Sequence, residues 1–151
     1  PMTTMSETNA RYRSCLYTDY LIHSPEVPVF RDEEDTLIDE PWCVSMLTVP
    51  AVNAGAVRRQ EPENVPRIQE TMLRRMEKLL SVAVVHQHQT LVLGAWGCGV
   101  FQNDPAEVAR WFHFPLAQNE TFRNAFESVT FAVRHRTFAQ STITPFYRQF
   151  A

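Results

Sequence analysis

The chain has 151 residues, of which 44% are hydrophobic and 21% charged, and its formal net charge is −3. This composition is typical of one globular domain with a hydrophobic core and excludes a disordered chain. The negative net charge argues against a protein that binds duplex DNA through a basic face.

Two further classes are not expected. No run approaches the roughly 18 apolar residues of a membrane span, and no hydrophobic region of a signal peptide is visible. The three cysteines, Cys15, Cys43 and Cys98, are odd in number and widely spaced. They predict a reducing, intracellular location in the cytoplasm or nucleus and no disulfide framework.

The first third of the chain is predicted to be loose and then extended. Residues 1–15 are expected to form a flexible N-terminal segment. Two short extended pieces follow, Tyr20–His23 and Val27–Phe30, and the prolines around them favour a sheet edge or a loop. Residues 31–40 include six acidic side chains and predict a solvated loop, since a metal site would need more ordered spacing.

A strand is predicted over residues 43–49, and Pro50 ends it. Residues 50–55 and a following linker lead to a long helix that begins near Asn64, a suitable N-cap, with Pro66 in the first turn. Apolar residues recur there at helical spacing and predict the buried face: Ile68, Met72, Met76, Leu79, Leu80 and Ala83.

The rest of the chain alternates between strands and helices. Strands are predicted over 90–93 and 129–133, and helices over 105–112, around Phe122 and Phe126, and over 144–150. Alternation of this kind predicts an α/β fold with a parallel or mixed sheet covered on both faces. Ligands of such folds bind at the carboxyl ends of strands, where the glycine-bearing loops 50–55 and 94–103 lie.

The loop 94–103 is the strongest candidate site. It contains three of the four glycines and lies between a strand and a helix start at Asp104. Such a loop can surround phosphate oxygens with backbone N–H groups. The aromatic residues Trp96 and Phe101 favour a ligand with both phosphates and rings. The alternative is a tight strand-to-helix turn without a ligand, because short glycine motifs are weak evidence.

Two other groups of reactive side chains carry less weight. His86 and His88 at the end of the long helix could share a metal, but no third ligand is near in the sequence. Cys98 lies close to a helix N-terminus, which lowers the pKa of a thiol, yet no histidine partner is implied. We therefore expect no metal, and we expect Cys98 to be a small residue in a crowded loop.

The loop residues 94–101 resemble the diphosphate-binding loop of poly(ADP-ribose) glycohydrolases, with the pattern Gly-x-Trp-Gly-Cys-Gly-x-Phe. Ser24-Pro-Glu-Val-Pro-Val-Phe-Arg31 is similar to a Ser-Pro-x-Val-Pro-Val-Phe-Arg segment of the microbial type of this family. The strand and loop 44–55 and the stretch 91–104 are similar to its next segments. The resemblance runs from about residue 16 to the end and corresponds to the C-terminal part of the family.

The resemblance implies a single domain over residues 16–151, an N-terminally truncated macrodomain-like three-layer α/β/α fold with a mixed sheet. It also implies ADP-ribose or poly(ADP-ribose) as the ligand, without a cofactor. Backbone groups from Gly97 to Val100 would bind the diphosphate and distal ribose, Phe101 would pack on a ribose or adenine, and Trp96 would support the loop. The full set comprises a binding loop, Gly94, Trp96, Gly97, Cys98, Gly99, Val100 and Phe101, and a neighbouring wall, Pro50 and Asn53.

One departure from the family pattern affects catalysis. The family carries a Gly-Gly-Gly loop and a Gln-Glu-Glu run before the Ser-Pro segment, and neither occurs here, so the catalytic residues are unknown. We expect ADP-ribose binding with weak or no hydrolysis. The alternatives are an active glycohydrolase completed by another chain or an unrecognised acid, and an interaction module without nucleotide binding. An unpaired sheet edge also predicts a homodimer or pairing with a separate N-terminal half.

Overall fold

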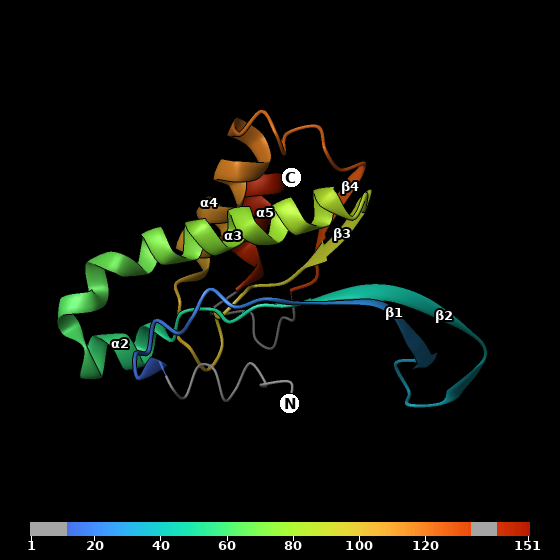
Figure 1. The fold of residues 1–151 in the computed structure, drawn as a ribbon, viewed down its shortest axis with the longest axis horizontal. Coiled ribbons are helices and arrows are strands. Elements are labelled where there is room, and N and C mark those ends of the chain that lie inside the picture. The colour runs from blue at the N-terminus through green and yellow to red at the C-terminus, as the bar shows by residue number, and fades with distance from the viewer. Residues whose placement is uncertain (1–11, 134–141) are drawn as a thin grey trace.

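The computed structural model describes residues 12–133 and 142–151 (Figure 1). Most of the predicted flexible segment 1–15 lies outside these residues, so that prediction stays untested. The elements follow in the order β1 (Ile22–Arg31), β2 (Leu37–Thr48), α2 (Ala54–Gln60), a 3₁₀-helix (Pro62–Arg67), α3 (Ile68–Val85), β3 (Thr90–Leu93), α4 (Pro105–His113), a π-helical turn (Phe114–Gln118), β4 (Ser128–Phe131) and α5 (Ile143–Phe150). In the described ranges, no helix is both long and apolar enough to cross a bilayer.

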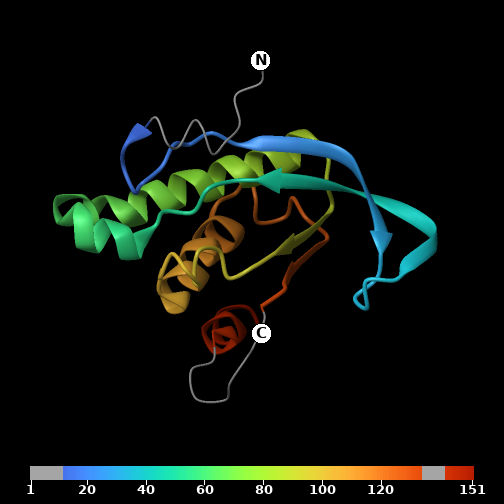
Figure 2. The same ribbon diagram turned by 90° about the horizontal axis from the view of Figure 1, so that it is seen from below.

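The strands form two pairs. β1 and β2 run antiparallel, with Val27 opposite Val44, and make a long ribbon that reaches beyond the helices (Figure 2). β3 and β4 run parallel, with Leu91 opposite Val129. Parallel pairs need a crossover connection, and here the chain between them includes α4. The described strands and helices alternate from β2 onward, which confirms the predicted α/β class.

The core lies between the helices and the strand pairs. The predicted inner face of α3 is buried, with Met72, Met76 and Leu80 fully enclosed. On the other side, Phe112 of α4 meets Phe131 of β4 at a ring-centroid distance of 5.5 Å, and Phe131 lies 5.2 Å from Phe146 of α5. This aromatic chain holds α5 against α4 and the parallel pair, since aromatic side chains bury much apolar area.

Two predictions for the first half of the chain were wrong. β1 is one continuous strand and not two extended pieces; its ladder shifts register between Ser24 and Val27, where Glu26 takes a positive φ of 53°. This bulge accommodates Pro25, which has no N–H to donate to the ladder. The predicted acidic loop is also shorter, because β2 already begins at Leu37. Asp39 and Glu40 are exposed there, so their charges do not oppose strand formation.

Helix boundaries also differ from the prediction. The expected linker after residue 55 is helix α2, which Asn53 caps by accepting a hydrogen bond from Ala56 N at 3.0 Å. Asn64 caps no α-helix and lies in the 3₁₀-helix instead. Phe122 lies in a turn and Phe126 in an irregular segment, and neither lies in a helix. In α2 the sequence did contain an N-cap signal, Asn53, but the short helix had little apolar periodicity to reveal it.

Candidate functional site

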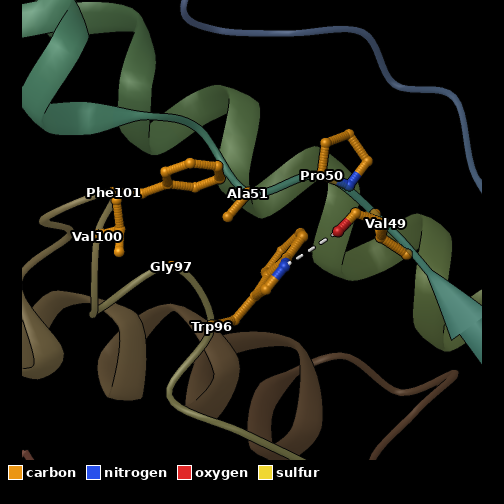
Figure 3. A pocket seen from close by; sticks show the side chains of 7 residues that line it. All are labelled: Val49, Pro50, Ala51, Trp96, Gly97, Val100 and Phe101. Carbon is orange, nitrogen blue, oxygen red and sulfur yellow. Dashed lines mark hydrogen bonds between the residues drawn. The ribbon is translucent and has the colours of Figure 1, made fainter. Parts of the chain in front are cut away.

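A pocket of about 280 Å³ lies where the two predicted loops meet (Figure 3). Its walls come from the end of β2 and the next loop on one side and from the glycine-rich loop on the other. The lining residues are Val49, Pro50, Ala51, Trp96, Gly97, Val100 and Phe101. None of these side chains is ionisable. The predicted wall residue Pro50 is therefore in the pocket, together with four of the seven predicted loop residues.

Hydrogen bonds hold the glycine-rich loop against α2 and the loop before it. Gly55 N donates to Phe101 O at 2.9 Å, and the Arg58 guanidinium donates twice to Gln102 O, at 3.1 and 3.2 Å. The buried Asn103 side chain donates to Val52 O at 2.8 Å and to Gly97 O at 3.1 Å. Two segments about 50 residues apart in sequence thus form one fixed rim.

The structure requires glycine at position 97 of the loop but not at position 99. Gly97 has a φ of +74°, and a Cβ there would stand 2.5 Å from Asn103 Nδ2 and 2.7 Å from the Ala51 Cβ. Both the conformation and the close approach require glycine. At Gly99 a Cβ would meet nothing within 4 Å. Packing therefore does not explain Gly99, and open space for a ligand remains beside it.

The backbone amides of the loop are only partly used. The N–H groups of Trp96, Cys98, Gln102 and Asn103 donate to backbone carbonyls of the same loop. Those of Gly99, Val100 and Phe101 donate to no backbone or side-chain acceptor within the described residues. Gly99 and Val100 are exposed and Phe101 is half-buried, so a ligand can reach these N–H groups. Three consecutive free amides beside a pocket are suited to bind an anion.

The two aromatic residues of the loop take different positions. The Trp96 indole Nε1 donates to Val49 O at 3.3 Å, and its ring lies 6.2 Å from that of Phe112. Trp96 therefore fastens the loop to the end of β2. Phe101 is half-buried, and its ring centroid lies 5.8 Å from that of Tyr17. The sequence did not single out Tyr17 as a neighbour of the site, because its proximity depends on tertiary contacts.

Cys98 and Asn53 have structural surroundings. Burial raises the pKa of the Cys98 thiol to about 12, and the charge of Asp104 adds to this. A protonated thiol is a poor nucleophile. Asn53 caps α2 with its side chain, and its N–H donates to Cys15 O at 3.0 Å. Neither residue lines the pocket, and nor do Gly94 and Gly99, so their contribution to binding stays a prediction.

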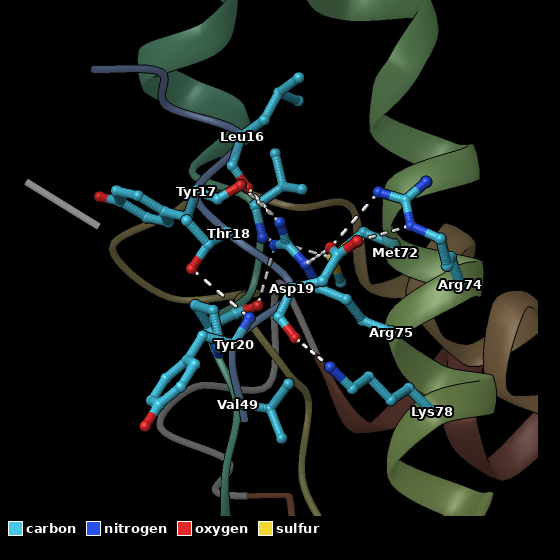
Figure 4. Close-up of polar contacts among 12 residues, drawn as sticks. Leu16, Tyr17, Thr18, Asp19, Tyr20, Val49, Met72, Arg74, Arg75 and Lys78 are labelled. Atoms are coloured by element: carbon cyan, nitrogen blue, oxygen red, sulfur yellow. Dashed lines mark hydrogen bonds and ion pairs between the residues drawn. The ribbon is translucent and has the colours of Figure 1, made fainter. Parts of the chain in front are cut away.

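A buried arginine binds the loop that follows β2, and its surroundings are drawn in Figure 4. Arg75 of α3 is 1% exposed, and its Nη1 donates to Pro50 O at 3.0 Å. Its Nη2 donates to Leu16 O at 2.7 Å and to Tyr17 O at 2.8 Å. The single cation thereby joins the segment before β1, the loop after β2 and α3. The helical pattern predicted only apolar residues on this buried face.

Asp19 balances the charge of Arg75. Its Oδ1 accepts from Arg75 Nε at 2.8 Å, and its Oδ2 accepts from Arg74 Nε at 2.7 Å. Burial by itself would raise the pKa of Asp19, but hydrogen bonds from Arg74 and Arg75 outweigh it and lower that pKa. Lys78 Nζ also donates to Asp19 O at 2.6 Å. Three cations of α3 hold this one residue in place.

The histidines at the end of α3 gain a third partner from β1. His23 lies with its ring centroid 3.9 Å from that of His86 and 5.9 Å from that of His88. Nevertheless, among residues 12–133 and 142–151, no group of three His, Cys, Asp or Glu side chains is arranged to hold a metal ion. The cluster joins β1 to the helix end. His23 was missed as its member because sequence distance hides this contact.

The sequence matches no protein-family model and no curated protein. Solved structures do match. The chain is 46% identical to poly(ADP-ribose) glycohydrolase from Deinococcus radiodurans in complex with ADP-ribose, with a TM-score of 0.89. It is 43% identical to poly(ADP-ribose) glycohydrolase from Thermomonospora curvata, with a TM-score of 0.86.

Each match covers 94% of this chain, but only 56% of the Deinococcus chain and 51% of the Thermomonospora chain. The chain therefore spans about half the length of these relatives. The matches confirm the resemblance to microbial poly(ADP-ribose) glycohydrolases and the macrodomain-like α/β fold that the sequence predicted.

Proposed function

We propose that this relative of the microbial poly(ADP-ribose) glycohydrolases binds ADP-ribose in the pocket between residues 49–51 and 96–101. The observation that carries the proposal is the row of free amides at Gly99, Val100 and Phe101. These donors fit a diphosphate, and Phe101 offers an apolar surface to a ribose or adenine ring. The Deinococcus relative was solved with ADP-ribose bound, which supports the same ligand class here.

The size of the pocket limits what it holds. Its volume of about 280 Å³ is just below the range of roughly 300 to 1,000 Å³ of typical ligand pockets. We therefore assign the diphosphate and one ribose to it and leave the remaining part of the nucleotide outside. Binding of a partly enclosed ligand is expected to be micromolar or weaker, because less surface is buried.

Hydrolysis is proposed to be weak or absent. Cleavage of a glycosidic bond needs an acid to protonate the departing oxygen and a position for the attacking water. None of the seven lining residues has an ionisable side chain, and the Cys98 thiol is held protonated. Lack of a general acid costs roughly two to four orders of magnitude in rate.

Calorimetric titration of ADP-ribose into the purified chain tests binding. Gly99→Glu and Gly99→Gln form a matched pair, because a Cβ at this position meets no neighbour and the two side chains differ only in charge. We expect Gly99→Glu to weaken binding at least ten-fold more than Gly99→Gln, since its carboxylate repels phosphate. No binding by the folded wild type would refute the proposal and favour an interaction module.

A second assay tests the proposed lack of hydrolysis. The chain is incubated with poly(ADP-ribose), and free ADP-ribose is quantified beside the Deinococcus enzyme at equal concentration. We expect the chain to release ADP-ribose at least a hundred-fold more slowly than the Deinococcus enzyme. This is the lower limit of the rate loss, roughly a hundred-fold to ten-thousand-fold, that follows from the lack of a general acid. Release at a comparable rate would favour the active alternative, with an acid supplied by another chain or by residues outside the pocket.

Two other predictions remain proposals. A reducing intracellular location is supported by Cys15, Cys43 and Cys98, all of which are free thiols. Association of the chain, with a second copy or with a separate polypeptide, is supported by the β1–β2 ribbon, in which neither strand has a further neighbour among the described residues.

A further inference from the structure

The outer face of the β1–β2 ribbon is a ladder of apolar side chains. Residues opposite each other on antiparallel strands share a face. Ser24 pairs with Met46, Val27 with Val44, and Val29 with Trp42, so one face carries Val27, Val29, Trp42, Val44 and Met46. We call this set the outer ladder. Trp42 is 56% exposed and Met46 is 46% exposed.

The opposite face of the ribbon has a partner in the molecule at its base, whereas Pro28, Cys43 and Ser45 farther along that face are exposed. His23 pairs with Leu47 on that face. The His23 ring lies against those of His86 and His88 at the end of α3, and Leu47 packs against the hydrophobic core. The outer ladder therefore faces away from α3, and Figure 2 shows the ribbon continuing past the helices. No described element covers the ladder.

An isolated two-stranded ribbon is marginally stable in water, and three strands or a packed face are usually needed. Trp and Met are also enriched at the centres of protein interfaces. The relatives that match this chain at 43–46% identity contain about as much chain again outside the match. A segment equivalent to this additional polypeptide is the candidate partner for the outer ladder.

Charge distinguishes two candidate partners. The loop and strand next to the ladder carry six exposed acidic side chains: Asp32, Glu33, Glu34, Asp35, Asp39 and Glu40. A second copy would bring six more to the same surface, which is unfavourable. A different polypeptide with Lys or Arg at this position would complement them.

We infer that the outer ladder docks a polypeptide segment equivalent to the part of the glycohydrolase relatives that this chain does not span. That segment supplies an apolar strand or helix to the ladder and basic side chains to the acidic end of the ribbon. The inference rests on the proposed association and is independent of nucleotide binding.

The test uses the separately expressed part of the Deinococcus enzyme that the match leaves out as the probe, with complex formation followed by light scattering and calorimetry. Trp42→Asp and Cys43→Asp form a matched pair of exposed neighbours on opposite faces of β2. We expect a one-to-one complex that Trp42→Asp weakens at least ten-fold and Cys43→Asp weakens less than three-fold.

Met46→Lys, on the same face as Trp42, provides a second variant, and circular dichroism shows that each variant is folded. A homodimer that Trp42→Asp disrupts would overturn the choice of partner. If the chain and the probe are both folded by circular dichroism and form no complex, or if Trp42→Asp and Cys43→Asp cause equal losses, the docking surface is overturned. ADP-ribose binding is measured separately, so a failure of the proposed function can be distinguished from a failure of the docking proposal.

Discussion

The glycine-rich loop 94–103 and the β1–β2 ribbon are fixed in opposite ways. Hydrogen bonds from Gly55, Arg58 and Asn103 hold the C-terminal end of the loop, although it has no regular secondary structure. The bond from Trp96 Nε1 to Val49 O holds its first half. The ribbon has a regular ladder, yet much of its length projects from the body with exposed apolar side chains. Regularity of the backbone is therefore a poor guide to how firmly each region is held.

Tertiary contacts explain this difference. The loop leaves three of its N–H groups without an acceptor among the described residues, so its own backbone hydrogen bonds are few, and bonds from Gly55 and Arg58 add to them. The ribbon satisfies its inner hydrogen bonds locally but buries little surface, so it depends on its attachments to α3 and on a partner. Four substitutions test four features separately: the attachment of the ribbon to α3, the conformation of the loop, the ionisation of the histidine cluster and the bulge of β1.

The largest effect is expected at Arg75, which ties the segment before the ribbon and the loop after it to α3. Arg75→Leu would remove one of the two arginine donors of Asp19 and would take the Arg75 donor from the carbonyls of Leu16, Tyr17 and Pro50. Each buried polar group left unsatisfied costs about 1 to 3 kcal/mol, so these losses together cost about 3 to 5 kcal/mol. We expect a loss of this size in the free energy of unfolding, measured by urea denaturation.

Arg74→Leu is the matched control for Arg75→Leu. Arg74 binds the same carboxylate of Asp19, but its side chain is 50% exposed. Exposed ion pairs contribute about 1 kcal/mol or less, so the control should lose no more than that. Similar losses in both variants would show that burial of Arg75 does not secure the base of the ribbon.

The second effect tests the loop. Gly97→Ala places a Cβ against Asn103 and Ala51 at a positive φ, so it combines steric overlap with backbone strain. We expect a loss of about 2 to 3 kcal/mol in urea denaturation. Gly99→Ala, in the same loop but with open space around it, should change stability by less than about 1 kcal/mol. If Gly97→Ala left the free energy of unfolding unchanged, the loop would not have the conformation and contacts described above.

These two regions also differ in how well the sequence predicts them. The loop was predicted closely, because its signals are local: a strand, glycines, and Asp104 as the N-cap, whose side chain accepts from Ala106 N at 2.7 Å. The inner face of α3 was predicted by periodicity. Arg75 was not, since a buried cation on an apolar face is recognisable only when its acceptors from two distant segments are known.

The ribbon was predicted less well for a related reason. Prolines at 25 and 28 and the acidic run 31–40 are local signals against strands, and they suggested two short pieces and a loop. The strand persists because a bulge accommodates Pro25 and because Asp39 and Glu40 are exposed. Pairing with the next strand of the hairpin, β2, outweighs local propensity, which depends more on context in strands than in helices.

The third prediction concerns pH and the attachment of β1 to α3. Burial, and next the charges of His86 and His88, lower the pKa of His23 from 6.5. The unfolded chain then binds more protons below about pH 6.5, so folding stability falls as the pH drops and is unaffected above that value. We expect the urea midpoint to fall between about pH 7.5 and pH 5.5, and His23→Gln to reduce that fall.

His113→Gln serves as the control for this pH dependence. His113 lies on α4, outside the cluster, and its ring contacts Phe150 instead. The variant should keep the wild-type dependence of the urea midpoint on pH. If His23→Gln and His113→Gln behave alike, the histidine cluster does not couple the ribbon to the helix end.

The smallest effect is expected at the bulge of β1. Glu26 is exposed and has a φ of 53°, which costs a residue with a side chain about 1 to 2 kcal/mol. Glycine removes this strain but loses more entropy on folding, so we expect Glu26→Gly to stabilise the protein by about 0.5 kcal/mol. Ser24→Gly, in the same strand without a positive φ, should destabilise it by a similar amount. Since the two substitutions then differ in sign, a common loss of stability would show that the bulge is not formed in solution and that Pro25 interrupts β1 as the sequence suggested.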